Sequence, residues 1–291
     1  MMFFLREYFT EAAVVREAQV ATLGGQRSLV PGTLAYADSI HYLRILGDTP
    51  NIAAVLTTPA LAESAAPHLG VVTSDDPRTA FYSLHQKLLG QYPKLTASRG
   101  VDGRIHPSAI IGEHVRIGDR VRIGPGVTIE DNSEISDDVL VEPGARIGVE
   151  GILYLKDAEG IRHVDHAGGV RIGAGATIHA NAVVVRSVHD SVPTIIGPRC
   201  IIGIASCVGH EAEVGADCVI SGNCVIARNT IVGDHAFIGT NAYVRENIRV
   251  GTAAKVMAGA IVVTNVPDRA AVSGNFATSH ERRLKEFANA R

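Results

Sequence analysis

The chain has 291 residues, enough for two domains, and its composition is 46% hydrophobic and 20% charged with a net charge of −3. Because this balance comes without a basic stripe, it excludes nucleic acid as the main partner. The opening MMFFL run is too short for a signal sequence or a membrane span, so we expect a cytoplasmic protein without a transmembrane segment.

Residues 1–97 predict a small α/β domain, because short apolar stretches alternate there with helical patterns. The apolar stretches lie at 19–23, 33–37, 53–58 and 69–73. The clearest helix begins at Asp76-Pro77, since Asp is a good N-cap and Pro suits the first turn. Residues 94–103 are interpreted as a linker to the next domain.

An aliphatic residue then recurs at every sixth position, which neither a helix nor a single strand explains. One ladder runs Ile105, Ile111, Ile117, Ile123, Ile129, Ile135, Val141, Ile147. A second runs Ile196, Ile202, Val208, Val214, Ile220, Ile226, Val232, Ile238, Val244, Val250, Val256, Val262. Hexapeptide repeats of this kind predict a parallel β-helix, here over 104–266, in which three hexads form one triangular coil. Cys200, Cys218 and Cys224 occupy the small-residue position of their hexads, so we interpret them as interior residues without redox or zinc chemistry.

Two segments interrupt this pattern, and a tail follows it. Residues 148–169 shift the frame and should leave the β-helix as a loop that carries Tyr154, His163 and His166. Asp190 falls at an inward position, where an unpaired carboxylate is too costly, so residues 187–194 should bulge outward. Residues 267–291 form a tail with a short charged helix predicted at 279–290.

Several segments in this order resemble the UDP-3-O-acylglucosamine N-acyltransferase family of lipid A biosynthesis. They are AYADSIHYLRIL (35–46), DPRTAFYSLHQKL (76–88), IHPSAIIGEHVRIG (105–118), GVEGILYLKDAEGIRHVDHAGGVRIG (148–173) and CVGHEAEVGADCVISG (207–222). The resemblance implies a left-handed parallel β-helix preceded by a nucleotide-sugar-binding domain and followed by a short C-terminal helix. It also implies a homotrimer with its active sites in clefts between subunits.

The resemblance assigns roles to residues of both domains. His210 falls where the family has its general base, and an imidazole is suited to take a proton from an attacking amine at neutral pH. Glu211, the next residue, could orient that imidazole as the acid of a triad does. His210 lies at a coil corner, so it should point away from the helix interior. On the same basis, Tyr36 and Tyr42 would sandwich the nucleobase.

The chain also departs from the family at several of these positions. Ser39 replaces an asparagine of the nucleotide segment, Asn247 stands where a second histidine is expected, and Glu211 replaces the usual asparagine. His166, at the end of the inserted loop, could approach a neighbouring site. The tail segment 258–277 resembles the end of hexapeptide acetyltransferases that use coenzyme A, which makes four residues candidates for the acyl-donor groove: Lys255, Met257, Gly259 and Asn275. A histidine followed by an acidic residue looks more like the sugar-nucleotide N-acetyltransferases of bacterial glycan pathways.

These features predict an N-acyltransferase of bacterial lipopolysaccharide or glycan biosynthesis. It would move an acyl group from acyl-CoA or acyl-ACP to the amino group of a nucleotide-linked amino sugar, without a bound cofactor or metal. One alternative is the lipid A enzyme itself, acting with acyl carrier protein. From other classes, a non-catalytic trimeric scaffold and a metal-dependent hydratase like the γ-class carbonic anhydrases remain open. The hydratase needs three convergent imidazoles, and His163–His166 is the one close pair in the repeat region.

Overall fold

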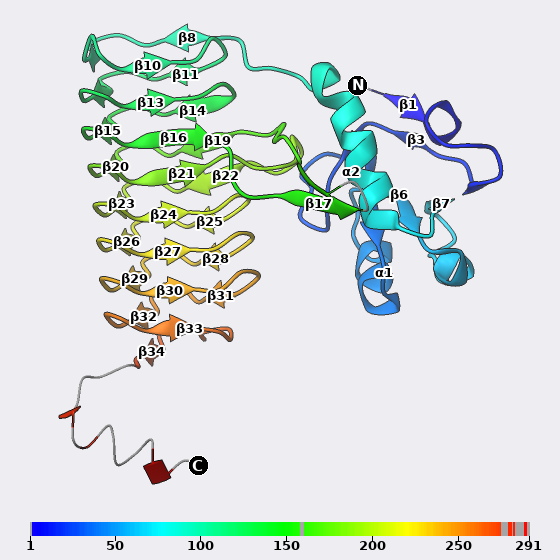
Figure 1. The fold of residues 1–291 in the computed structure, drawn as a ribbon. Coiled ribbons are helices and arrows are strands. Elements are labelled where there is room, and N and C mark those ends of the chain that lie inside the picture. Colours follow the sequence, from blue (N-terminus) through cyan, green and yellow to red (C-terminus); the bar gives the residue numbers. More distant parts are fainter. Residues whose placement is uncertain (1, 158–159, 275–278, 281, 283–287, 290–291) are drawn as a thin grey trace.

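The computed structural model describes residues 2–157, 160–274, 279–280, 282 and 288–289. A long column of short strands lies beside a smaller α/β domain, and residues 92–97 join the two at the top of the column (Figure 1). Among the described residues, no helix has both the length and the apolar character needed to cross a bilayer.

The N-terminal domain is built on a five-stranded sheet in the order β2-β7-β6-β5-β4. Its strands are β2 (Val14–Arg16), β4 (Thr22–Leu23), β5 (Thr33–Ala37), β6 (Ile52–Thr57) and β7 (Gly70–Thr73). Strands β4 to β7 pair in parallel, whereas β2 runs antiparallel to β7. A short antiparallel pair precedes the sheet, formed by β1 (Phe3–Phe4) and β3 (Gln19–Val20). The 3-10 turns are η1 (Leu5–Glu7), η2 (Pro59–Ser64) and η3 (Leu89–Gln91).

Two α-helices pack on this sheet, and each begins at a side-chain cap. The predicted helix is present as α2 (Pro77–Leu88), where the Asp76 carboxylate accepts a hydrogen bond from the Thr79 N–H at 3.0 Å. Helix α1 (Ile40–Gly47) begins in the same way, because the Ser39 hydroxyl accepts from the Tyr42 N–H at 3.3 Å. Ser39, which replaces an asparagine of the family, therefore has a structural role as the N-cap of α1.

The column is the predicted left-handed parallel β-helix, made of three sheets that we call sheets I, II and III. Sheet I contains β10 (Ile110–Ile111), β13 (Thr128–Ile129), β16 (Arg146–Val149), β21 (Val183–Val185), β24 (Cys207–Val208), β27 (Val225–Ile226), β30 (Tyr243–Val244) and β33 (Ile261–Val262). Sheet II contains β8 (Ser98–Arg99), β11 (Arg116–Ile117), β14 (Ser133–Ile135), β19 (Val170–Ile172), β22 (Thr194–Ile196), β25 (Glu213–Val214), β28 (Ile231–Val232) and β31 (Arg249–Val250). Sheet III contains β9 (Arg104–Ile105), β12 (Arg122–Ile123), β15 (Leu140–Val141), β20 (Thr177–Ile178), β23 (Ile201–Ile202), β26 (Val219–Ile220), β29 (Phe237–Ile238), β32 (Lys255–Val256) and β34 (Ala271–Val272).

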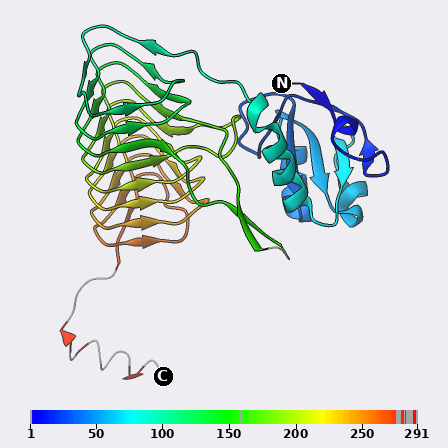
Figure 2. The same cartoon turned by 45° about the horizontal axis from the view of Figure 1, so that its top comes forward.

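The ladder aliphatics stack directly above one another, as the six-residue period predicts. Ile202 pairs with Ile220 and Val208 with Ile226, each eighteen positions further along the chain. These side chains form one continuous core with the small residues, and Cys200, Cys218 and Cys224 are fully buried in it. Viewed obliquely, the coils are seen as a stack of closed triangles (Figure 2).

Strand pairing extends the β-helix beyond the ladder at both ends. Within the predicted linker, β8 pairs with β11 in the first coil, so pairing begins before residue 104. At the far end β34 pairs with β32, beyond residue 266. The helix predicted at 279–290 falls mostly outside the described residues.

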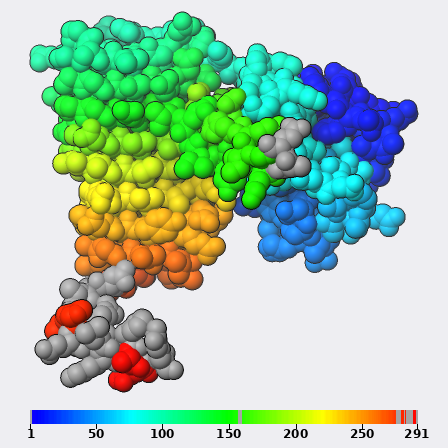
Figure 3. Space-filling view, viewed as in Figure 1, coloured from blue at the N-terminus to red at the C-terminus, as the bar shows by residue number. Residues whose placement is uncertain are grey.

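Both interruptions leave the β-helix, as predicted, and both contact the N-terminal domain. Residues 148–169 form a hairpin of β17 (Tyr154–Asp157) and β18 (Gly160–His163), which reaches toward α2 and lies between the two domains (Figures 1 and 3). Leu155, Val164 and Ala167 are buried in the core of the N-terminal domain. Residues 187–194 bulge out, and the Ser191 hydroxyl donates to the Leu23 carbonyl at 3.0 Å. Asp190 is thereby removed from the helix interior.

Candidate functional site

A cavity of 690 Å³ lies where the β-helix, the N-terminal domain and the base of the hairpin meet. The N-terminal domain contributes Tyr36 from β5 and Tyr42 from α1, while the β-helix contributes His210, Glu211 and Asn247. Five of the residues expected from the sequence therefore line one cavity, although they are far apart along the chain. All of these lining residues belong to one chain.

His210 and Glu211 occupy the corner between β24 and β25. Glu211 has a φ of 59°, and this left-handed turn allows neighbouring side chains to leave the β-helix on the same side. Outside the helix core, His210 is nevertheless only 7% exposed, because the N-terminal domain and the hairpin cover it. His210 therefore points away from the helix interior, as expected, but it is not exposed to solvent.

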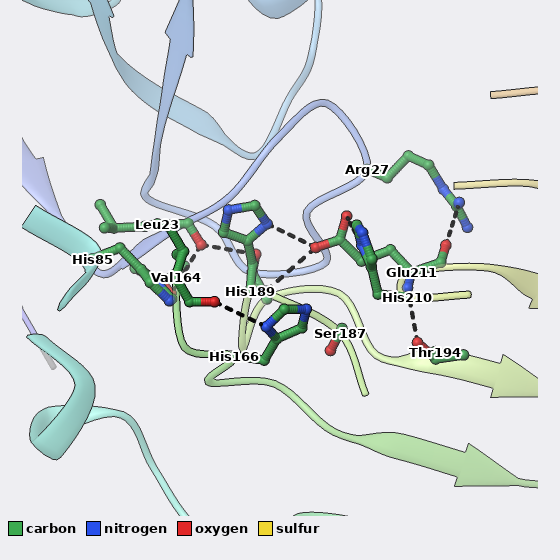
Figure 4. Close-up of polar contacts among 12 residues, drawn as sticks. Leu23, Arg27, His85, Val164, His166, Ser187, His189, Thr194, His210 and Glu211 are labelled. Atoms are coloured by element: carbon green, nitrogen blue, oxygen red, sulfur yellow. Dashed lines mark hydrogen bonds and ion pairs between the residues drawn. The ribbon is translucent and has the colours of Figure 1, made fainter. Parts of the chain in front are cut away.

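The Glu211 carboxylate makes its hydrogen bonds to His189 and lies farther from His210 (Figure 4). Its Oε1 accepts from His189 Nδ1 at 2.8 Å and from the His189 backbone N–H at 3.3 Å. Its Oε2 lies 4.0 Å from His210 Nδ1. Burial alone would raise the pKa of Glu211, but the charge and hydrogen bonds of His189, together with His210, lower it to about 2. Glu211 is therefore a carboxylate at neutral pH, with one oxygen still available to His210.

His210 itself is held neutral by its surroundings. Burial lowers the pKa of its imidazole to about 4, against the opposing effect of Glu211, and the neighbouring His166 and Arg228 lower it further. Its Nδ1 is buried and has no hydrogen-bond partner among the residues that the structure describes. A neutral ring is the form that accepts a proton.

His166 lies next to His210 of the same chain. The two rings meet edge to face with their centroids 5.6 Å apart. His166 is buried, its Nδ1 contacts the Val164 carbonyl at 3.1 Å, and burial lowers its pKa. His166 thus packs against the imidazole of His210, at the edge of the cavity's catalytic candidates.

Tyr36 and Tyr42 are both half-buried, and burial raises the pKa of each phenol. The Tyr36 ring already packs against Phe81 at 5.1 Å and Tyr82 at 5.9 Å between centroids. Tyr42 lies against Gly25 at the mouth of the loop that follows β4. Both rings belong to the wall that the N-terminal domain contributes to the cavity, whereas His210 and Glu211 belong to the wall contributed by the β-helix.

The expected donor residues are not brought to this cavity. Lys255, Met257 and Gly259 lie at or near the corner between sheets III and I, whereas His210 lies at the corner between sheets I and II. Gly259 has a φ of +70°, so the turn there requires a residue that tolerates a left-handed backbone. Asn275 lies outside the described residues. Within one chain, these residues cannot form a donor groove that leads to His210.

Several residues that line the cavity were not expected from the sequence. Asn229 and Asn265 stack with the expected Asn247 on the corner of Glu211, since the three follow it at steps of eighteen residues, and Arg228 stacks in the same way on His210. Adding eighteen residues, the length of one coil, to positions 210 and 211 repeatedly identifies these residues from the sequence. Arg228 and Arg249 make no ion pair with any residue that the structure describes, and Glu211 is the single carboxylate among the described residues of the lining. The cavity is therefore electropositive.

His189 was also not among the residues expected at the site. It is 8% exposed, because the bulge that contains it is pressed against α2. Arg27, from the N-terminal domain, contributes a second interdomain contact. Its guanidinium donates to the Glu211 carbonyl at 2.9 Å and pairs with Glu213 at 2.7 Å.

One group of metal-type donors occurs among the described residues, at the base of the hairpin. One donor atom from each of Glu150, His163 and His166 lies within 4.8 Å of the others. Glu150 already bonds His163 Nε2 at 2.9 Å and the backbone N–H of His166 at 3.2 Å, whereas His166 Nε2 has no partner among the described residues. The group has two imidazoles, whereas the γ-class arrangement needs three, and it does not line the cavity.

The buried histidines predict how the stability of the protein depends on pH. The pKa values of His210 and His85 are lowered to about 4 from 6.5, so between these values the unfolded chain binds more protons than the folded chain. The free energy of unfolding should therefore fall as the pH drops from about 6.5 to 4, by up to about 3 kcal/mol for each group. Denaturant titrations at pH 7.5 and 4.5 measure this change. A constant unfolding free energy would contradict it.

Comparison with known proteins supports the repeat architecture. The family model described as bacterial transferase hexapeptide (six repeats) matches residues 104–131, and the hexapeptide repeat of succinyl-transferase matches 193–228 and 229–264. UDP-3-O-acylglucosamine N-acyltransferase 2 of Legionella pneumophila strain Paris is 48% identical over 52 residues, which is 18% of this chain and 15% of that relative. The strain Lens relative of the same name is 43% identical over 53 residues, covering 18% of this chain and 16% of the relative. The match thus spans a small fraction of either relative.

Among solved structures, the UDP-N-acetylglucosamine acyltransferase of Francisella novicida superposes with a TM-score of 0.52. The superposition covers 66% of this chain and 72% of that one at 24% sequence identity. The two proteins therefore share the β-helical fold.

Proposed function

We propose that this chain, whose repeats match hexapeptide transferase models, acylates the amino group of a nucleotide-linked amino sugar. The acyl group would come from a thioester, and the reaction would serve lipopolysaccharide or glycan synthesis in the bacterial cytoplasm. One observation carries the proposal: Tyr36 and Tyr42 of the N-terminal domain line the same cavity as His210 and Glu211 of the β-helix.

In the proposed reaction the neutral His210 takes a proton from the sugar amine as its nitrogen attacks the thioester carbonyl. A carbon–nitrogen bond forms, the carbon–sulfur bond breaks, and the proton passes from the imidazolium to the departing thiolate. The Glu211 carboxylate, 4.0 Å from His210 Nδ1, would stabilise the imidazolium that exists between these steps. Because burial lowers its pKa, the His210 ring is unprotonated at neutral pH and can accept a proton when substrate arrives.

The positive charge of the cavity supports an acceptor sugar that is linked to a nucleotide. Arg228 and Arg249 extend along the β-helix below His210, and the aromatic residues lie on the other wall. A nucleoside diphosphate carries both an aromatic base, which stacks on tyrosine, and phosphates, which arginine binds. The volume of 690 Å³ lies within the range of small-molecule sites, roughly 300–1,000 Å³.

The donor we favour is a CoA thioester with a short or hydroxylated acyl group. The resemblance of the tail to acetyltransferases that use coenzyme A supports this choice. Acyl-ACP is the alternative donor. It would fit a lipid A enzyme, and the Legionella relatives are named as UDP-3-O-acylglucosamine N-acyltransferases. Thioesters of CoA and of carrier protein with matched chain length would distinguish the two. Transfer from long-chain acyl-ACP alone would overturn our choice.

The proposed function is tested by offering the purified protein a panel of UDP-, GDP- and dTDP-linked amino sugars with these donors. We expect a product heavier by one acyl group, and an amine that no longer reacts with amine-specific reagents. The free amino sugar, without its nucleotide, is the matched control and should react far more slowly. Binding of a nucleotide sugar without acylation by any donor would instead indicate a non-catalytic scaffold.

We further propose a homotrimer, and its most direct structural support is an apolar stripe on sheet I. Val225, Tyr243 and Ile261 face outward from successive coils and are 39%, 36% and 60% exposed. Exposed apolar patches of this kind mark interfaces.

Light scattering should accordingly give three times the 30.7 kDa chain mass, and the double variant Val225→Glu/Ile261→Glu should reduce it to one chain. Glu134→Gln, on the outer face of sheet II, is the control and should remain a trimer. A wild-type protein of single-chain mass would contradict the proposed assembly.

A further inference from the structure

We infer that His189 is a positioning residue, which holds the Glu211 carboxylate so that its second oxygen can bond the imidazolium of His210. This inference rests on the proposed function, because it concerns the proton transfer of the same site. Its basis is the pair of hydrogen bonds that His189 gives to Glu211.

Both bonds go to the same carboxylate oxygen. Oε1 accepts from the ring at 2.8 Å and from the backbone N–H at 3.3 Å, and these two donors from one residue fix the plane of the carboxylate. Oε2 then lies on the side of His210, 4.0 Å from a ring nitrogen that has no other partner among the described residues. A shift of about one ångström on protonation of His210 would close this gap to hydrogen-bond length.

The backbone of Glu211 is fixed by the same bulge. Its N–H donates to the Thr194 hydroxyl at 2.8 Å, so the two ends of the segment 187–194 hold the carboxylate and the amide of one residue. Figure 4 shows His189 and Thr194 on opposite sides of the Glu211 corner. The bulge that removes Asp190 from the helix interior thus also provides the support of the proposed catalytic pair.

His189 is in turn held by helix α2. Its ring stacks on Tyr82 with an interplanar angle of 20° and a centroid distance of 6.1 Å, and Phe81 and His85 approach it at 5.7 and 5.9 Å. The docking of the N-terminal domain therefore determines where Glu211 points.

His189 is not itself placed to exchange a proton with substrate. Its Nδ1 is bonded to Glu211, and its Nε2 is buried with no partner among the described residues. Since one ring nitrogen is bonded and the other is buried, the ring has no exposed nitrogen to offer an amine. His210 carries the proton, and His189 acts through Glu211.

The test compares two substitutions of His189. His189→Leu keeps the bulk and removes the donor, whereas the amide of His189→Asn can still donate to Glu211. We expect the leucine variant to lower kcat about 10- to 100-fold with KM changed less than about threefold, and the asparagine variant to recover most of the loss. The acid limb of the kcat profile should move to higher pH in the leucine variant, because a Glu211 without its donor protonates more easily.

His179→Leu is the matched control, because His179 Nδ1 also bonds a glutamate, Glu142 at 2.9 Å, but neither residue lines the cavity. Its kcat should equal that of the wild type. Thermal unfolding curves of all three variants confirm that the compared proteins are folded.

A second measurement does not depend on turnover. Titration of the Glu211 carboxyl by carbon NMR should show a pKa raised by at least about one unit in His189→Leu and little changed in His189→Asn. If the wild type acylates nothing, the proposed function fails, yet the NMR comparison still decides whether His189 controls Glu211. Equal pKa values and equal kcat values in the leucine variant and the wild type would overturn the inference.

Discussion

Replacing His210 by alanine should lower kcat for acyl transfer by about 10²- to 10⁴-fold, which is the usual contribution of a positioned general base. The ring lies in the cavity with its carboxylate neighbour, so alanine removes the proton acceptor and leaves the rest of the lining in place. KM for the nucleotide sugar should change little, because the proposed nucleotide contacts lie on the opposite wall and on the arginines. Steady-state kinetics with saturating donor measure both constants.

His235→Ala provides the control for this experiment. His235 lies on the same β-helix but has a side chain that is 62% exposed, and it lies at a different corner of the coil. It should retain wild-type kcat. A His210→Ala enzyme with wild-type kcat would remove His210 from the mechanism, and the family resemblance would then concern the fold alone.

Ile202→Ala should lower the free energy of unfolding by about 2–5 kcal/mol. Ile202 is fully buried between Ile178 and Ile220 in the stack of sheet III, so alanine leaves a cavity that neighbouring coils can fill only in part. Denaturant unfolding followed by circular dichroism gives the value.

Ile201→Ala is the matched control for Ile202→Ala. Ile201 has the same side chain in the same two-residue strand, but it points outward and is 39% exposed. Ile201→Ala should cost well under half as much as Ile202→Ala in the isolated chain. Equal losses at the two positions would mean that the six-residue frame does not determine which side chains enter the core.

Most of the β-helix could be predicted from the sequence, because its order is local and repetitive. An aliphatic at every sixth position defines the inward face without any knowledge of distant contacts, and Ile147 and Val208 lie where that count places them. Helix α2 could be predicted for a similar reason, since Asp76 and Pro77 determine its start from within one turn. The hairpin was recognised only as a break in the frame, because its strands pair with each other and carry no ladder residue.

The candidate site was harder to predict, since it depends on how the two domains dock. His210 and Glu211 were identified through resemblance, but their burial depends on Tyr82 and the bulge at 187–194, which no local pattern connects. His189 was missed for this reason. The donor residues Lys255, Met257 and Gly259 were chosen by position in the tail, and the coil geometry puts them on another edge of the β-helix.

The N-terminal domain has a double role in this arrangement. It supplies the aromatic wall of the cavity, and through Arg27 and α2 it also fixes the Glu211 corner. Such a fixed arrangement would reduce the reorganisation needed during proton transfer. We expect substitutions in the interdomain contact to lower activity even when they touch neither substrate.

The most direct test of the proposed chemistry is a structure of the protein with a nucleotide-linked amino sugar. We expect the base beside Tyr36 and Tyr42, and the amino nitrogen within about 3.2 Å of a His210 ring nitrogen, the distance that proton transfer requires. A sugar amine bound far from His210, or a nucleotide bound outside this cavity, would contradict the account.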